Sequence, residues 1–216
     1  MNPIVPILTA LATLVLANTA QADEKTFELP EIKSVTSRGA FNIVVQVGEK
    51  QSVVVKGTAL QLGRLTAEWK SGTLVLHQTD HFNNSNGNSF KKGESVDVLI
   101  SVAQLQSFQM EGAGKTVLHN ISGDKFELNY QGAGTLEADG RVKALVLSAN
   151  GVGAINAQAL TAQTVEAAVN GVGSVKVRAT ESLAAQVNGI GSLTYFGRPA
   201  QVSKSVSGIG RVSAGD

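Results

Sequence analysis

Two histidines and an aspartate form the most metal-like pattern in the chain, His77-x-x-Asp80-His81. Histidine nitrogen and aspartate oxygen are common zinc ligands. The surrounding residues lack the helical periodicity that would place residues i and i+4 on one face, and no fourth ligand follows nearby. The sequence therefore predicts no metal site and no cofactor. It contains no cysteine, so thiolate chemistry is excluded as well.

Carboxylates offer a second route to chemistry, because glycoside hydrolysis and polysaccharide cleavage need clustered acids. Glu127, Glu137 and Asp139 come nearest to such a cluster. Their spacing does not place them in one column of stacked strands, so we interpret them as solvated surface charges. No G-x-S-x-G nucleophile motif occurs. We predict no catalytic residue and no enzyme activity. The alternative is a carbohydrate-active enzyme, which requires these carboxylates to converge.

The near-zero net charge of the chain argues against two classes of partner, nucleic acids and anionic membrane surfaces. The chain has 18 basic and 17 acidic residues, a formal net charge of +1. Nucleic acids and anionic membrane surfaces attract proteins with an excess of basic residues, so neither is a predicted partner. Six G-x-G sequences occur, but they lack the further residues of nucleotide-binding loops and the aspartates of calcium-binding β-rolls.

Residues 1–22 have the features of a secretory signal peptide. An apolar run from about Ile4 to Ala17 leads to Ala20-Gln21-Ala22, an A-x-A cleavage pattern. A positive segment before this run is missing, apart from the α-amino group. A transmembrane anchor would need about 20 apolar residues, which the run does not supply. The sequence therefore predicts export to the bacterial cell envelope, periplasmic or secreted, with no membrane span after cleavage.

Glycine pairs return every 18 to 20 residues in the second half of the chain. They are Gly112–Gly114, Gly132–Gly134, Gly151–Gly153, Gly171–Gly173, Gly189–Gly191 and Gly208–Gly210. A fixed period is typical of solenoids, and glycine suits a sharp bend because it adopts positive φ without strain. The predicted fold is all-β, a single-chain parallel right-handed β-helix (β-solenoid), with its handedness taken from the general preference of parallel crossovers.

Apolar residues recur at fixed places relative to each pair. Four columns are predicted to face the interior, namely those four and two residues before the pair, between its glycines, and two residues after it. The column between the glycines contains Ala113, Ala133, Val152, Val172, Ile190 and Ile209. Just before the first glycine, Asn150, Asn170 and Asn188 are expected to form a hydrogen-bonded ladder along the stack.

Residues 23–101 lack the glycine pairs but contain β-branched runs such as 41–47 and 95–101. We predict that they continue or cap a solenoid formed by residues 102–216. Within them, Trp69-Lys70-Ser71-Gly72 and the following residues resemble a hairpin. The polar, asparagine-rich stretch at 80–93 predicts a mobile loop. We interpret that loop as an insertion, although loops also carry binding residues.

The pattern resembles a bacterial family called the putative auto-transporter adhesin head GIN domain. The matching stretches include GAFNIVVQVGEKQSVVVKG, VDVLISVAQLQSFQMEGAGKT, the NGVG and NGIG sequences, and the closing LTYFGRPAQVSKSVSGIGRVSAG, which together cover roughly residues 39–214. Three pairs read Asn-Gly-x-Gly where many relatives carry Ser-Gly-Ser-Gly. The resemblance implies a secreted or envelope β-solenoid, and it implies no catalytic, cofactor-binding or metal residue.

These observations predict a non-enzymatic envelope or secreted protein with an adhesion-like, binding or scaffolding role. A glycan or an envelope protein is the expected ligand, since a solenoid offers long flat faces. A homo-oligomer is a further expectation, because a terminal strand offers unpaired backbone groups to another chain. Lys204 and Arg211 are candidate gatekeeping charges against such pairing.

The signal peptide gives the first testable prediction. Cleavage after Ala22 will leave Asp23 as the first residue of the exported chain. N-terminal sequencing of the protein from the periplasmic or culture-medium fraction measures this directly. A mature chain that starts at Met1 would contradict it.

Overall fold

The computed structural model describes residues 23–78 and 95–215. Its elements are β1 (Asp23–Phe27), β2 (Ser34–Val47), β3 (Ser52–Gly57), α1 (Ala59–Gly63), β4 (Leu65–Lys70), β5 (Thr73–Gln78), β6 (Val96–Val102), β7 (Ser107–Ala149), β8 (Val152–Val169), β9 (Val172–Phe196), β10 (Gln201–Gly208) and β11 (Arg211–Ala214). The predicted signal peptide at 1–22 and the predicted loop at 80–93 lie outside the described residues.

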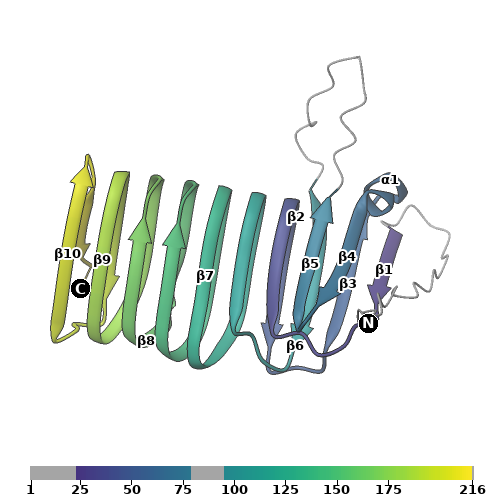
Figure 1. Cartoon of the computed structure of the whole chain (residues 1–216), viewed down its shortest axis with the longest axis horizontal. Helices are drawn as coiled ribbons and strands as arrows, with labels where there is room; N and C mark the ends of the chain where they lie inside the picture. The colour runs from purple at the N-terminus through teal and green to yellow at the C-terminus, as the bar shows by residue number, and fades with distance from the viewer. Residues whose placement is uncertain (1–22, 79–94, 216) are drawn as a thin grey trace, which may run out of the picture.

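The strands form one mixed sheet of eleven strands (Figure 1), with the order β1-β3-β6-β2-β7-β8-β9-β10 along its main path. The prediction of a single-chain parallel right-handed β-helix is therefore wrong. The pairs β1–β3, β3–β6 and β4–β5 are antiparallel. Short connections in the first part of the chain reverse its direction: residues 48–51 turn the chain from β2 into β3, and Ser71 and Gly72 turn it from β4 into β5. β3 therefore runs opposite to β2, and it pairs in the antiparallel sense with β6, which is parallel to β2.

The hairpin of β4 and β5 is an example of a short connection that sets the direction of the next strand. Ser71 and Gly72 join the two strands with φ of 49° and 84°. Two successive residues with positive φ match the twist of an antiparallel pair and keep the loop short. The hairpin predicted around Trp69 is thus confirmed. Before it, α1 begins with a capping box, in which Gln61 N–H donates to Thr58 Oγ1 and Thr58 N–H donates to Gln61 Oε1.

Parallel pairs make up the rest of the sheet. β2 pairs with β7, β7 with β8, β8 with β9, and β9 with both β10 and β11. Glycines of successive pairs lie beside one another, since Gly134 is in register with Gly153 and Gly153 with Gly173. Figure 1 shows these strands side by side along the long axis of the molecule, with their ends curving.

Side chains alternate between buried and exposed along the long strands. In β7 to β9, the predicted interior columns before and after the glycine pairs are buried, for example Leu147, Ala149 and Ile155. The column between the glycines is not, because Val152, Val172 and Ile190 are 59%, 48% and 59% exposed. That part of the interior prediction is wrong. The residue between the glycines lies three positions after a buried residue, and an odd number of steps along a strand leads to the opposite face.

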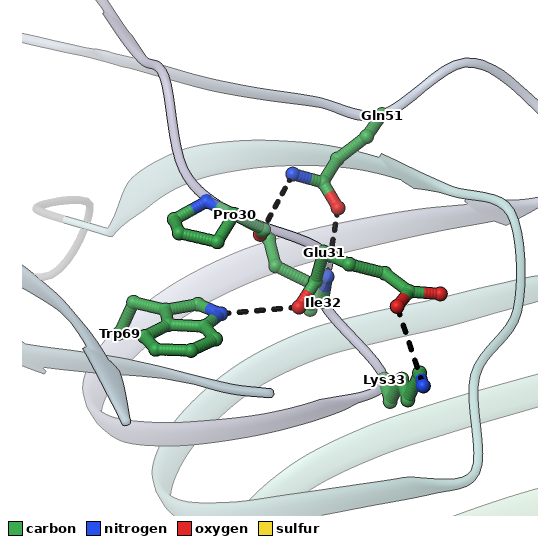
Figure 2. A network of polar contacts seen from close by, with 6 residues as sticks. All are labelled: Pro30, Glu31, Ile32, Lys33, Gln51 and Trp69. Carbon is green, nitrogen blue, oxygen red and sulfur yellow. Dashed lines mark hydrogen bonds and ion pairs between the residues drawn. The ribbon is translucent and has the colours of Figure 1, made fainter. Parts of the chain in front are cut away.

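The segment between β1 and β2 is fixed by two side chains from other strands and turns (Figure 2). The Gln51 side chain donates from Nε2 to Pro30 O at 3.0 Å and accepts from Ile32 N–H at Oε1 at 2.7 Å. The same Nε2 also donates to Leu29 O at 2.6 Å. Trp69 donates from its indole Nε1 to Glu31 O at 3.1 Å. These bonds satisfy backbone groups that no strand partner reaches, and they hold the segment across the N-terminal end of the sheet.

Close backbone approach explains the glycine pairs. A Cβ atom built on Gly171 would lie 2.0 Å from the carbonyl oxygen of Gly151, and one built on Gly151 would lie 2.1 Å from that of Gly132. Positive φ, the predicted reason for the glycines, applies to Gly153 with φ of 152°. For Gly171 the requirement is space against the neighbouring backbone, which cannot move aside as a flexible side chain would.

Replacement of Gly171 tests this packing. Gly171→Ala should lower the free energy of unfolding by more than about 4 kcal/mol, or abolish folding, because the methyl group has no room. Gly63→Ala is the control, since a Cβ there meets nothing within 4 Å. Denaturant unfolding followed by circular dichroism measures both variants. Equal stability of Gly171→Ala and the wild type would contradict the close approach.

Candidate binding surface

A column of exposed apolar side chains follows the glycine pairs across the sheet. We call it the apolar column: Ala113, Ala133, Val152, Val172, Ile190 and Ile209. Ala133 is in register with Val152, and Val152 with Val172, so these three members are one strand spacing, about 4.8 Å, apart. The last member, Ile209, is 81% exposed. Scattered exposed aliphatic residues are ordinary on protein surfaces, whereas a contiguous row is typical of an interaction site.

The size of the side chains changes along the stack in opposite directions on the two faces. On the outer face, the apolar column changes from alanine to valine and then to isoleucine towards the C-terminus. On the buried face, the column four residues before each pair changes from Phe108 and Leu128 through Leu147 to Ala167 and Ala185. The larger apolar residues of the apolar column thus lie on the exposed face, where they do not contribute to the core. Core packing therefore does not explain the exposed valines and isoleucines.

An amide ladder runs beside the apolar column. Asn170 donates from Nδ2 to Asn150 Oδ1 at 2.8 Å, and Asn188 donates from Nδ2 to Asn170 Oδ1 at 2.9 Å. The predicted asparagine ladder is confirmed. Each asparagine lies two residues before a member of the apolar column, as Asn150 does before Val152. Because the amides bond to one another, they form an ordered, uncharged border to the column.

Tyr130 lies beneath this surface with its ring in the core. The residue is 2% exposed, and its hydroxyl oxygen has no hydrogen-bond partner within the described part of the chain. A Cβ on Gly153 would lie 3.0 Å from that oxygen, so the hydroxyl reaches the glycine backbone directly below the apolar column. Burial raises the pKa of the Tyr130 hydroxyl. A cavity of about 10 Å³ adjoins it, near the lower limit for one water molecule.

The three carboxylates proposed for chemistry do not converge on a shared groove. Glu127 contacts Lys125 at 2.5 Å, Glu137 contacts Lys115 at 3.5 Å, and Asp139 Oδ2 lies 2.6 Å from His119 Nδ1. Asp139 also accepts a bond from Asn120 N–H at 2.8 Å. Each acid is therefore paired with its own basic or donor neighbour, as expected of solvated surface charges.

An open groove of about 680 Å³ contains one of these carboxylates, Glu127, together with Asp124. Its other lining residues include Gln104, Gln106 and Ser122. A hydrogen bond from Lys143 and its charge lower the pKa of Asp124, which opposes a role as a general acid near neutral pH. Both carboxylates of the groove are paired with lysines, Asp124 with Lys143 at 2.7 Å and Glu127 with Lys125 at 2.5 Å, as expected of surface ion pairs.

Of the metal-like pattern His77-x-x-Asp80-His81, only His77 lies among the residues that the structure describes. His77 is at the end of β5, whereas Asp80 and His81 lie outside the described residues. Within residues 23–78 and 95–215, no group of three or more His, Asp or Glu side chains is arranged to hold a metal ion. Over the same ranges, no helix is long and apolar enough to cross a membrane.

Comparison with known proteins places this arrangement in a family. The model of the family described as "Putative auto-transporter adhesin, head GIN domain" matches residues 32–199. The chain belongs to this family. The resemblance stated from the sequence is thus confirmed, and the family is described as one of adhesins rather than enzymes. Among curated proteins, none matches the chain.

Solved structures support the same fold. A putative adhesin from Bacteroides fragilis is 22% identical with a TM-score of 0.70, over 91% of this chain and 98% of that chain. A putative lipid binding protein from Parabacteroides distasonis is 18% identical with a TM-score of 0.51, over 91% of this chain and 98% of that chain. At these identities the likeness concerns the fold alone.

The glycine period predicts the members of the apolar column correctly, but their prediction as interior residues is wrong. Successive side chains of a strand point to opposite faces, and the glycines of each pair occupy positions of the buried face. The residue between them must therefore lie on the exposed face. The increase from alanine to isoleucine was visible as well, and in an exposed column it is a signal for binding.

Replacement of Tyr130 by phenylalanine tests the unpaired hydroxyl. Tyr130→Phe should raise the free energy of unfolding by about 1 kcal/mol, because it removes a buried polar group without a partner. Tyr195→Phe is the control, since Tyr195 is only partly buried. Urea denaturation measures the difference. A loss of stability in Tyr130→Phe would show instead that the hydroxyl is bonded, for example to a water in the adjoining cavity.

Proposed function

We propose that this chain is an exported, non-enzymatic protein of the bacterial cell envelope that binds an envelope protein in an adhesion-like manner through the apolar column. The exposed row of Val152, Val172, Ile190 and Ile209 is the observation that carries this proposal. Membership of the adhesin family and the signal-peptide pattern of residues 1–22 support it.

The chemistry of the surface favours a protein partner over a glycan. Sugar rings are commonly held by aromatic faces and by charged or amide groups that bond to hydroxyls, whereas the column is aliphatic. Its asparagine border is already bonded along the ladder, which leaves fewer amide groups free for sugar hydroxyls. Aliphatic side chains of another protein would complement a row of valines and isoleucines by simple burial.

The expected strength of a single contact is low. Full burial of a valine or isoleucine contributes about 1.5–3 kcal/mol, and the four side chains still have between 48% and 81% of their surface to bury. Four such residues supply roughly 4–6 kcal/mol on this basis, whereas association costs an estimated 4–15 kcal/mol. Useful adhesion would therefore depend on many copies acting together on one surface, which raises the effective affinity without new contacts.

A set of threonine substitutions tests the proposal. Thr is close to Val in shape and keeps the β-branched side chain, so the changes Val152→Thr, Val172→Thr, Ile190→Thr and Ile209→Thr remove apolar surface with little effect on the sheet. Binding of the multivalent protein to outer-membrane protein extract should fall at least about tenfold, which corresponds to 1.4 kcal/mol. Attachment to beads through Lys50→Cys, in a turn of a chain without cysteine, gives a uniform orientation.

The matched control is Val44→Thr with Leu99→Thr. These two exposed residues, on β2 and β6, are in register with each other and lie outside the apolar column. Phospholipid vesicles, a glycan array and a polysaccharide-cleavage assay run beside the extract. Unchanged binding by the fourfold variant, or polysaccharide cleavage that Glu137→Gln abolishes, would contradict the proposal.

A further inference from the structure

Two strands mark opposite ends of the sheet. Among the described residues, β1 pairs with β3 alone and β10 pairs with β9 alone. Each therefore has one row of backbone N–H and C=O groups without a partner strand. Figure 1 places β1 and β10 at the two ends of the long axis. Such edges are templates for pairing with another chain, and contact between unlike edges would extend without closing.

Each of these edge strands carries a lysine where its neighbour has a buried apolar residue. Lys25 of β1 is in register with Val55, which is fully buried. Lys204 of β10 is in register with Ala185, which is 4% exposed. Residues in register share a face of the sheet, so both lysines belong to rows that are otherwise part of the core.

Both lysines lie over aromatic rings. Lys25 Nζ is 4.8 Å from the centre of the Phe27 ring, and Lys204 Nζ is 4.7 Å from the centre of the Tyr195 ring. The ring faces attract the ammonium groups while these remain in contact with water. Beside Lys204, Val202 and Val206 are 40% and 45% exposed, although their register partners Leu183 and Val187 are buried. The core face of the sheet is therefore exposed to solvent at β10, and the charged side chain of Lys204 covers part of it.

We propose that Lys25 and Lys204 prevent the two edges of the sheet from pairing with edges of other copies of this chain. A strand added to β10 would extend the core row and enclose the Lys204 ammonium without a counter-charge, which is strongly unfavourable. The same argument applies to Lys25 at β1. Inward-directed charges on edge strands are an established means of avoiding edge-to-edge aggregation.

The geometry distinguishes these lysines from other charges near the edges. Arg211, the second gatekeeper named from the sequence, is in register with Ser192 and not with a core residue. The remaining strands with a single neighbour, β4 and β11, are protected differently. β11 has only four residues, and β4 carries Glu68 and Lys70 as an ion pair on its exposed side.

Substitution of the two lysines tests the proposal on the exported full chain. The double variant Lys25→Val with Lys204→Val should form open polymers, with a weight-average mass that rises with concentration to more than about twice that of the monomer. Lys204→Val alone should stop at dimers, because Lys25 still protects the other edge. The wild type should remain monomeric at the same concentrations, an expectation that replaces the homo-oligomer expected from the sequence. Sedimentation velocity measures the masses, and electron microscopy shows the filaments.

Two controls separate the position of the charge from its general effect. Lys176→Val removes a lysine from the exposed face of β9, and Ser205→Val adds apolar bulk to the exposed face of β10. Both should remain monomeric. Lys204→Met, which keeps the side-chain length, should associate like Lys204→Val even if the valine variant folds poorly. A wild type that polymerises, a folded double variant that stays monomeric, or equal polymerisation of Ser205→Val would overturn the proposal.

Discussion

The close approach of neighbouring backbones at the glycine pairs is the constraint on which the rest of the structure depends. At these points the main chain of one strand lies against the carbonyl groups of the next, for example Gly171 against Gly151. This contact fixes the register between successive strands, because no other residue type fits. Once the register is fixed, equivalent positions of successive strands lie beside one another, so each position before or after the glycines forms a column across the sheet. The apolar column, the asparagine ladder and the buried columns are all consequences of that alignment.

The sequence was sufficient to predict the strands, the asparagine ladder and the family. The hairpin after Trp69 could also be predicted, because its turn is a local property of Ser71 and Gly72. The overall sheet could not be predicted in the same way. Whether β3 pairs with β6 or with another strand depends on contacts between distant parts of the chain, and the antiparallel β3–β6 pair has no signature in either segment. The glycine period in residues 102–216 predicts strands stacked in register, but a period alone does not distinguish the coils of a β-helix from strands of a mixed sheet.

The candidate site shows a different limit. The sequence shows which residues belong to the column. To know on which face of the sheet the column lies, one must also know that the alternation of side chains continues unbroken through the glycine pair. The edge lysines are a similar case. Lys204 lies four residues before a glycine pair, in a column whose other members are apolar, whereas Lys25 has no such column in its own segment. Only its register with Val55 shows that it occupies an equivalent place.

The single tryptophan of the chain has a consequence for how its unfolding can be observed. Trp69 binds Glu31 O through its indole and lies at the N-terminal end of the sheet, far along the chain from the glycine pairs (Figure 2). Intrinsic fluorescence at tryptophan wavelengths therefore monitors the docking of the segment between β1 and β2. If that segment opens before the parallel strands separate, fluorescence and far-ultraviolet circular dichroism will give two transitions at different denaturant concentrations. The native chain thus contains its own spectroscopic probe of one end.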